Sequence, residues 1–336
     1  MIRCTVARML YRLQGCLISS ELPLPAAQPV PDGAASGTPL VVELGGVRRI
    51  PHDAPVGTVL ATVEHDERAG TAFYTAVGTG NELVFRLHGV CDVVIDAAVS
   101  HLVCHLDPSA DPELVAVYLE GPVIAFVLGM RGEPVLHASA VSCGALGGRR
   151  IALAGGSGAG KSTVTALLCA LGCSLVTDDL LRLGFAPDGA VARWGCRELR
   201  LRAESGSVLD AFVSPRPGVR TTSDGRLALR LDIDARESVE LAAIVLPWPD
   251  HRLLHVELER LPRAEALVSL AQSPKLEGWR SREVLAMQLA ALTRLVKATP
   301  VLRARLPWSP MPTRAVAREL LDAIDLVIRD PPDPRY

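Results

Sequence analysis

The sequence has little net charge and no long apolar run, and each absence excludes a class of protein. Its 336 residues carry a formal net charge of -2, and no run of five or more basic residues occurs. Binding to nucleic acid or to an anionic membrane needs a concentrated positive surface, so neither partner is predicted. No segment supplies the roughly 18 uninterrupted apolar residues of a spanning helix, and membrane insertion is not predicted.

The eight cysteines lack the spacing of a metal site or of a disulfide framework. No Cys-x-x-Cys pair occurs, and no paired histidines accompany the cysteines. We therefore expect free, buried thiols. Leu13-Gln14-Gly15-Cys16 resembles a lipoprotein cleavage box, but arginines interrupt the apolar stretch that an export signal requires. A reducing cytoplasm is the predicted location.

The first part of the chain, residues 1–130, is predicted to form a small, mostly β domain. Residues 1–20 favour extended structure, and a Pro-rich loop follows them. Short apolar segments separated by turn residues indicate further strands. These segments are 40–44, 58–63, 82–87, 93–95 and 101–106. Residues 113–130 are predicted to be a helix that Pro122 kinks or breaks.

Residues 131–330 are predicted to form an α/β domain, so the chain as a whole is α+β. Apolar runs indicate strands, and the spacing of apolar residues at three and four indicates helices. The predicted strands are 135–142, 150–154, 175–177, 227–233, 241–246 and 254–261. The predicted helices are 163–171, 263–271, 282–298 and 313–328. In the second-last helix, Leu285, Leu289, Leu292 and Val296 recur at helical spacing and are predicted to be core residues, and the tail 330–336 is predicted to be loose.

A complete phosphate-binding loop (a Walker A motif) lies between a predicted strand and a predicted helix. The eight residues are Gly155-Gly156-Ser157-Gly158-Ala159-Gly160-Lys161-Ser162, and Thr163 opens the helix. Glycines allow successive backbone N–H groups to turn toward a phosphate. The lysine reaches β- and γ-phosphate oxygens, the serine hydroxyl ligates Mg²⁺, and the positive end of the helix faces the anion. The motif predicts a site for ATP and Mg²⁺.

Two acidic residues, Asp178 and Asp179, follow the next apolar strand. A P-loop fold delivers its metal-binding acid at such a strand end. One carboxylate can hold Mg²⁺ or its water shell while the other accepts a proton from an attacking hydroxyl. The alternative is a surface turn in which the two aspartates cap the following residues; the pair is a weak signal taken alone and a stronger one in its position one strand after a P-loop.

Three other residues are candidates with an ordinary alternative beside them. His137 lies in an uncharged, strand-like run, where a histidine is more often a satisfied core residue than a functional one. Arg226 and Arg230 are placed to offer a cation to a transferring phosphate or to lie on a solvated strand edge.

The motifs around these residues resemble HPr kinase/phosphorylase. The resemblance rests on Leu136-His137-Ala138, the P-loop at 155–162 and the run 175–179, within a looser match over residues 120–310. The nearest likeness is to relatives that accompany peptide natural-product pathways, including lasso-peptide tailoring kinases. The resemblance implies a P-loop kinase core related to phosphoenolpyruvate carboxykinase and phosphorylation of a serine hydroxyl on a protein or peptide.

The resemblance also implies a role for each matching residue. Lys161 is a phosphate contact, Ser162 helps to hold Mg²⁺, Asp178 is the general base, Asp179 is the metal-side acid, and His137 lies near the acceptor. The family's Glu-Ile-Arg-Gly-x-Gly signature is not matched, because residues 198–203 read Glu-Leu-Arg-Leu-Arg-Ala. Reverse phosphorolysis is therefore not expected.

Three functions are compatible with these observations. The first is a kinase that acts on a serine of a peptide or carrier protein. The second is a kinase for a small-molecule hydroxyl, such as an antibiotic, sugar or nucleoside, and the third is a nucleotide-binding regulatory module. The combination of His137 with the two aspartates favours an enzyme, because nucleotide binding alone needs no acceptor-side base. A homo-oligomer is compatible with all three.

Overall fold

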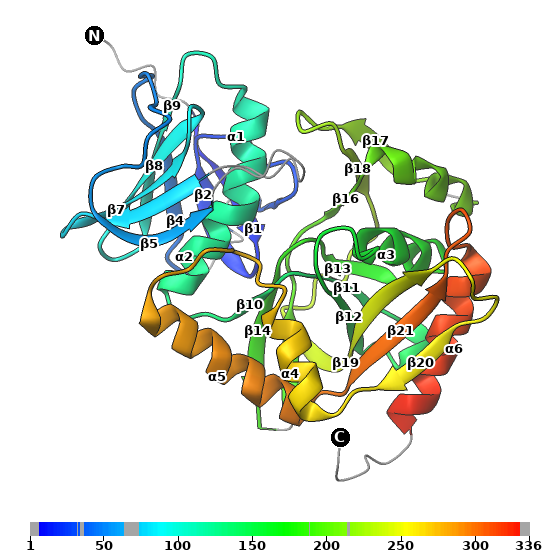
Figure 1. The fold of residues 1–336 in the computed structure, drawn as a ribbon. Helices are drawn as coiled ribbons and strands as arrows, with labels where there is room; N and C mark the ends of the chain where they lie inside the picture. The colour runs from blue at the N-terminus through cyan, green and yellow to red at the C-terminus, as the bar shows by residue number, and fades with distance from the viewer. Residues whose placement is uncertain are drawn as a thin grey trace. The chain divides into compact units, whose positions relative to one another are not determined.

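The chain forms a mixed α/β protein with several sheets, seen in a computed structural model (Figure 1). The structure describes residues 7–31, 33, 37–63, 74–187, 189–213 and 216–329. It divides into two compact units, one of residues 1–133 with 276–287 and one of residues 134–275 with 288–336. The segment 276–287 therefore belongs to the first unit, whereas the sequence analysis had assigned it to the second. Its hydrogen bonds, described below, are the physical reason.

The first unit is built on a nine-stranded sheet in the order β3-β1-β2-β4-β9-β8-β7-β6-β5. The strands are β1 (Met9–Leu13), β2 (Cys16–Ser20), β3 (Gln28–Pro29), β4 (Leu40–Leu44), β5 (Thr58–Val63), β6 (Tyr74–Gly78), β7 (Glu82–Leu87), β8 (Cys91–Asp96) and β9 (His101–Leu106). The short strands that the apolar segments predicted are present, and the prediction missed β3 and β6. The lipoprotein-like run forms the β1–β2 hairpin, in which Gln14 and Gly15 both take positive φ, as a two-residue hairpin turn requires.

One helical stretch of this unit packs against the sheet and is interrupted at Pro122, as predicted. It consists of α1 (Pro112–Tyr118), a π-helical segment (Leu119–Val123) and α2 (Ile124–Met130). Proline lacks the N–H that continues an α-helix, so the interruption has a local cause. Among the described residues, this stretch is long and apolar enough to cross a membrane, but 72% of its most apolar part is buried, which is typical of a core helix.

The segment 276–287 is held in the first unit by backbone and aromatic contacts. The Thr62 amide donates to the Gly278 carbonyl (3.0 Å), and the Tyr74 hydroxyl donates to the Glu277 carbonyl (2.8 Å). Trp279 stacks on Phe126 with ring centroids 5.3 Å apart. These contacts tie residues distant in sequence to the β5–β6 edge of the sheet.

The second unit contains a large sheet in the order β10-β14-β15-β19-β12-β11-β13, with β21 on β19 and β20 on β21. Its strands are β10 (Val135–Leu136), β11 (Ala138–Ser142), β12 (Arg150–Ala154), β13 (Ser174–Thr177), β14 (Leu181–Ala186), β15 (Gly189–Arg193), β19 (Ser238–Asp250), β20 (Glu257–Arg260) and β21 (Val301–Pro307). A three-stranded sheet lies beside it, formed by β16 (Glu198–Leu201), β18 (Leu227–Arg230) and β17 (Gly218–Thr221). Five of these strands, β14, β15, β16, β17 and β21, were not predicted.

Helices cover both faces of the large sheet. The helices are α3 (Lys161–Ala170), α4 (Arg263–Ala271), α5 (Arg282–Ala298) and α6 (Arg314–Arg329). Alternate residues of β12 point to opposite faces, so Ile151 and Leu153 join a core with α3 and α6, while Ala152 and Ala154 join a core with α4 and α5. The sheet is therefore the middle layer of a three-layer α/β arrangement.

The predicted apolar stripe on α5 is only half correct. Leu292 and Val296 are buried, but Leu285 and Leu289 are 47% and 53% exposed. Leu295 faces the α4–α5 core in their place and is fully buried. Helical spacing marks a stripe, but which stripe packs depends on where the neighbouring strands lie.

The prediction of free cysteines is wrong for one pair. Cys143, just after β11, forms a disulfide with Cys173, just before β13, and the two Cα atoms are 4.5 Å apart. The residues between them, across a sequence separation of 30, fold into β12, the P-loop and α3, which return the chain to its starting point. Spacing rules describe local motifs and do not detect a pair that the fold brings together. Cys91, Cys104, Cys169 and Cys196 are free thiols.

Candidate active site

The P-loop leaves the carboxyl end of β12 and enters α3, as its sequence predicted. Gly160 ends the loop in a left-handed conformation (φ +88°), and Lys161 is the first residue of the helix. A side chain at this position would be strained, and its Cβ would lie 2.5 Å from the indole of Trp308. The glycine is thus required both by the turn and by a close neighbour.

Lys161 is buried beneath the loop. Its ammonium group donates to the carbonyl oxygens of Gly155 (2.7 Å) and Gly156 (2.9 Å). Burial lowers the pKa of Lys161 to about 8, against the opposing effect of Asp179 and Asp178. Near neutral pH the lysine is therefore a cation with a readily removed proton.

Other side chains at the P-loop differ in their exposure: some face solvent and others are buried in the core. Thr163, the third residue of α3, is buried. The Arg202 guanidinium donates to the Ser157 hydroxyl (2.9 Å), which links the loop to the chain after β16.

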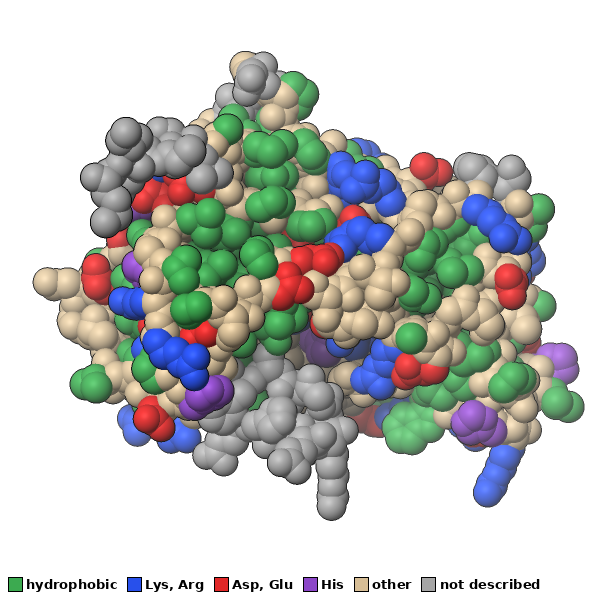
Figure 2. Space-filling view, turned by 90° about the horizontal axis from the view of Figure 1, so that it is seen from above, with side chains coloured by type: hydrophobic (Ala, Val, Ile, Leu, Met, Phe, Trp, Pro, Cys, Tyr) green, Lys and Arg blue, Asp and Glu red, His purple; other side chains and the backbone are tan. Residues whose placement is uncertain are grey.

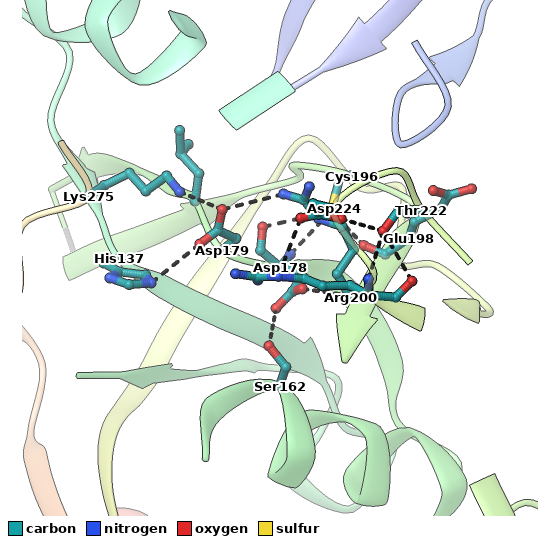
Figure 3. Close-up of polar contacts among 12 residues, drawn as sticks. His137, Ser162, Asp178, Asp179, Cys196, Glu198, Arg200, Thr222, Asp224 and Lys275 are labelled. Atoms are coloured by element: carbon teal, nitrogen blue, oxygen red, sulfur yellow. Dashed lines mark hydrogen bonds and ion pairs between the residues drawn. The ribbon is translucent and has the colours of Figure 1, made fainter. Parts of the chain in front are cut away.

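Asp178 follows β13 and is held by three hydrogen bonds (Figure 3). Its carboxylate accepts from the hydroxyls of Ser139 (2.6 Å) and Ser162 (3.0 Å) and from the amide of Arg200 (2.8 Å). It is 7% exposed. A carboxylate with these donors is fixed in orientation beside the P-loop serine.

Asp179 lies on the other side of its neighbour and faces three cationic or titratable groups (Figure 3). Its carboxylate is 3.3 Å from His137 Nε2, 2.5 Å from Lys275 Nζ and 3.5 Å from the Arg200 guanidinium. Burial alone would raise the pKa of Asp179, but these groups, Lys275 foremost, hold it well below its usual range.

The backbone conformation of Asp179 explains why the two adjacent carboxylates contact different partners. Asp179 has φ +68°, a conformation that a non-glycine residue adopts at a local energetic cost. In a regular strand, the alternation of side chains would place the second carboxylate on the opposite face of the sheet. The left-handed residue instead ends the strand and turns this carboxylate toward His137.

The structure gathers the predicted site residues into one place. The P-loop, Ser162, Asp178, Asp179 and His137 are linked by direct contacts. Arg226 lies close enough to Lys161 to lower its pKa, although it pairs with Asp224 at 3.4 Å. Arg230 instead lies 3.5 Å from the buried carboxylate of Glu198 and is 57% exposed.

Three residues that contact the two aspartates were missed from sequence: Ser139, Arg200 and Lys275. Ser139 lies in β11, two positions after His137, which is in the bend between β10 and β11, so its nearness to a candidate residue was a signal present in the sequence. Lys275 is 96 residues from Asp179 in sequence and carries no local motif. Only the fold brings it to the site.

The contacts do not follow the division of roles that the resemblance implied for the two aspartates. The P-loop serine, expected on the Mg²⁺ side, is hydrogen-bonded to Asp178. The histidine expected on the acceptor side contacts Asp179. The geometry favours the exchanged assignment.

The donors beside the P-loop suit Mg²⁺ in kind. Mg²⁺ prefers oxygen ligands and usually keeps several waters, so one hydroxyl and one carboxylate beside bound phosphates make a sufficient protein contribution. Ser162 Oγ and the Asp178 carboxylate provide this pair. No group of three or more His, Cys, Asp or Glu residues able to hold a metal occurs in the described part of the chain.

Comparison with known proteins gives little. No protein-family model matches the chain, and no curated protein matches it. Among solved structures, the Hpr(Ser) kinase/phosphatase from Coxiella burnetii matches with 11% sequence identity and a TM-score of 0.26, over 58% of this chain and 93% of that chain. A TM-score of this size supports no inference about function, which therefore rests on the residues of the site.

Proposed function

We propose that the chain is an ATP-dependent phosphotransferase that moves the γ-phosphate to a hydroxyl group. One observation carries the proposal: a complete P-loop lies beside two adjacent carboxylates, one bonded to the P-loop serine and the other to a histidine. The first carboxylate suits the phosphate side of a transfer site and the second suits the acceptor side.

On the phosphate side, three groups share the work. Lys161 exchanges its bonds to the loop carbonyls for bonds to β- and γ-phosphate oxygens, and Ser162 and Asp178 hold Mg²⁺. When bound, Mg²⁺ neutralises charge that develops on the transferring phosphate. Ser139 and the Arg200 amide keep Asp178 in place for this role.

On the acceptor side, Asp179 accepts the proton of the attacking hydroxyl. Its low pKa makes it a weak base, but phosphoryl transfer has a loose transition state in which the hydroxyl proton is removed late. His137 Nε2 orients the carboxylate, and Lys275 and Arg200 place positive charge where the transferring phosphate arrives.

The proposed acceptor is a serine hydroxyl of a peptide or a carrier protein. Its support is the similarity of the His137, P-loop and Asp178-Asp179 motifs to the HPr kinase family. A small-molecule hydroxyl fits the same chemistry. On the face shown in Figure 2, Lys and Arg side chains lie in separate groups among acidic and apolar ones. Among the residues that the structure describes, this face therefore has no concentrated positive surface that would favour a nucleic acid or an anionic membrane as the partner.

The test is transfer from γ-labelled ATP to acceptors supplied as peptide and metabolite extracts of the source cells. Wild type should label an acceptor in the presence of Mg²⁺, and Lys161→Ala should lose nearly all transfer while keeping its circular dichroism spectrum. Equal labelling by the two proteins would refute the site. Tight ATP binding by the wild type with no transfer to any acceptor would favour a nucleotide-binding regulatory module.

A further inference from the structure

The direction in which a bound nucleotide must run follows from the strand order. Strands β13, β12, β19 and β21 run parallel, with β11 antiparallel between the first two, so their carboxyl ends share one edge of the sheet (Figure 1). Ligands of open α/β sheets bind at this edge. The catalytic carboxylates follow β13, and the P-loop follows β12.

This order places the nucleoside away from the carboxylates. If the γ-phosphate points to Asp178 and Asp179, on the β13 side, the phosphate chain crosses the P-loop and the nucleoside leaves toward β19 and β21. The inference rests on the proposed function, because it takes the position of the γ-phosphate from it.

An aromatic side chain lies where the nucleoside would emerge. Trp308 follows β21 directly, and its six-membered ring is so near Gly160 that a Cβ there would meet three ring atoms at 2.5 to 3.3 Å. Gly160 is the loop residue that precedes Lys161. The indole is therefore in contact with the phosphate loop itself.

Trp308 is held in place but not enclosed. Its backbone amide donates to the Asp250 carbonyl (3.1 Å), which joins the ends of β21 and β19, and its side chain packs against the α3–α6 core. The residue is partly exposed. A rigid, half-buried aromatic surface loses little entropy when a flat ring stacks on it.

We infer that Trp308 is the stacking surface for the nucleobase and forms a nucleoside subsite separate from the phosphate contacts. Every base presents a π-face, and stacking on an aromatic side chain favours the larger purine ring. The expected ligand is a purine nucleoside triphosphate.

The experiment separates the base from the phosphates by comparing ATP with inorganic tripolyphosphate, both with Mg²⁺, by calorimetry. Trp308→Ala should weaken ATP binding by about 5- to 100-fold and leave tripolyphosphate binding unchanged within about twofold. Trp308→Phe, which keeps an aromatic ring, should recover most of the ATP affinity. Trp308→Leu also removes the aromatic ring, but it keeps an apolar side chain packed against the core.

Trp248 provides the matched control. It lies near the end of β19 and is 61% exposed, and its position in the strand puts it on the α4–α5 face of the sheet, opposite to the core on which Trp308 packs. Trp248→Ala should bind both ligands as the wild type does.

The outcomes distinguish this inference from the proposed function. The subsite would be overturned if Trp308→Leu and Trp308→Phe weakened the binding of ATP and of tripolyphosphate equally. It would also be overturned if these variants weakened the binding of neither ligand. Failure of the wild type to bind either ligand, or tripolyphosphate binding that survives Lys161→Ala, would instead reject the phosphate site and with it the proposed function.

Discussion

The Ser162 hydroxyl donates a 3.0 Å hydrogen bond to the Asp178 carboxylate, across 16 residues of sequence. The bond joins the first turn of α3 to the end of β13. Each residue is thereby kept in position by the other, and the carboxylate of the following residue, Asp179, is left to face His137. This relationship determines which aspartate we assign to metal and which to proton transfer.

The two aspartates should therefore respond differently to the same isosteric change. Asp178→Asn should weaken Mg²⁺-dependent ATP binding by about 10- to 100-fold, because the change removes a charged oxygen from the metal side. Asp179→Asn should bind ATP nearly as the wild type does but lose about 10²- to 10⁴-fold in transfer rate, because it removes the proton acceptor.

Calorimetry and single-turnover kinetics measure the two effects separately. Asp322→Asn, an exposed position on α6, serves as the control and should change neither. The reverse pattern would restore the roles implied by resemblance, with Asp178 as the base.

Lys161 should take up a proton when phosphates bind. Its pKa of about 8 in the free protein rises when the loop carbonyls are replaced by anionic oxygens, since a nearby negative charge favours the protonated form. At pH 8 we expect uptake of about half a proton per bound tripolyphosphate, and affinity should fall as pH rises from about 7 to 9. Calorimetry in two buffers with different ionisation enthalpies measures the uptake, and Lys161→Met should abolish it. Identical enthalpies in both buffers would contradict the lowered pKa.

Removing the Lys275 ammonium should shift the acidic limb of the activity profile to higher pH. Lys275 is the largest of the influences that lower the pKa of Asp179. The carboxylate carries its negative charge above this pKa and loses it below. In Lys275→Met the carboxylate pKa rises, so activity should disappear at a higher pH than in the wild type. Lys297→Met, an exposed residue at the end of α5, is the control and should leave the profile unchanged. Superimposable profiles for all three proteins would show that Lys275 does not act through Asp179.

Loss of the Cys143–Cys173 disulfide should destabilise the unit that carries the P-loop. A bridge that closes a loop of 30 residues restricts the unfolded chain and contributes roughly 3 to 4 kcal/mol. The double variant with serine at both positions should therefore unfold at a lower temperature than the wild type. Cys169→Ser, at a free thiol on α3, is the comparison and should change the midpoint less. If dithiothreitol left the wild-type midpoint unchanged, the bridge would not contribute to stability.

The strand, loop and helix of the P-loop motif were predictable because their determinants are local. A P-loop binds through the backbone of contiguous residues, so the glycine pattern from Gly155 to Gly160 and the following Lys161 specify it directly. The strand before and the helix after have the expected bounds within two residues. The paired aspartates at a strand end were visible for the same reason.

Long-range pairing was not predictable in this way. Strand β21 and the disulfide each depend on partners far along the chain, and their own residues do not name those partners. The exposed side of α5 shows the same limit: leucines at helical spacing predict a packed stripe, but neighbouring strands decide whether Leu289 or Leu295 is the one that packs.

The sequence by itself determined that this chain has a P-loop motif between a strand and a helix, with two carboxylates after the next strand, since short-range backbone geometry requires those residue types in that order. The tertiary structure decided how the site is divided. It brought Lys275 from 96 residues away to Asp179, placed Ser162 on Asp178, and set Trp308 against Gly160. The reason is physical: local sequence restricts backbone conformation, whereas the approach of distant side chains depends on the packing of strands and helices into layers.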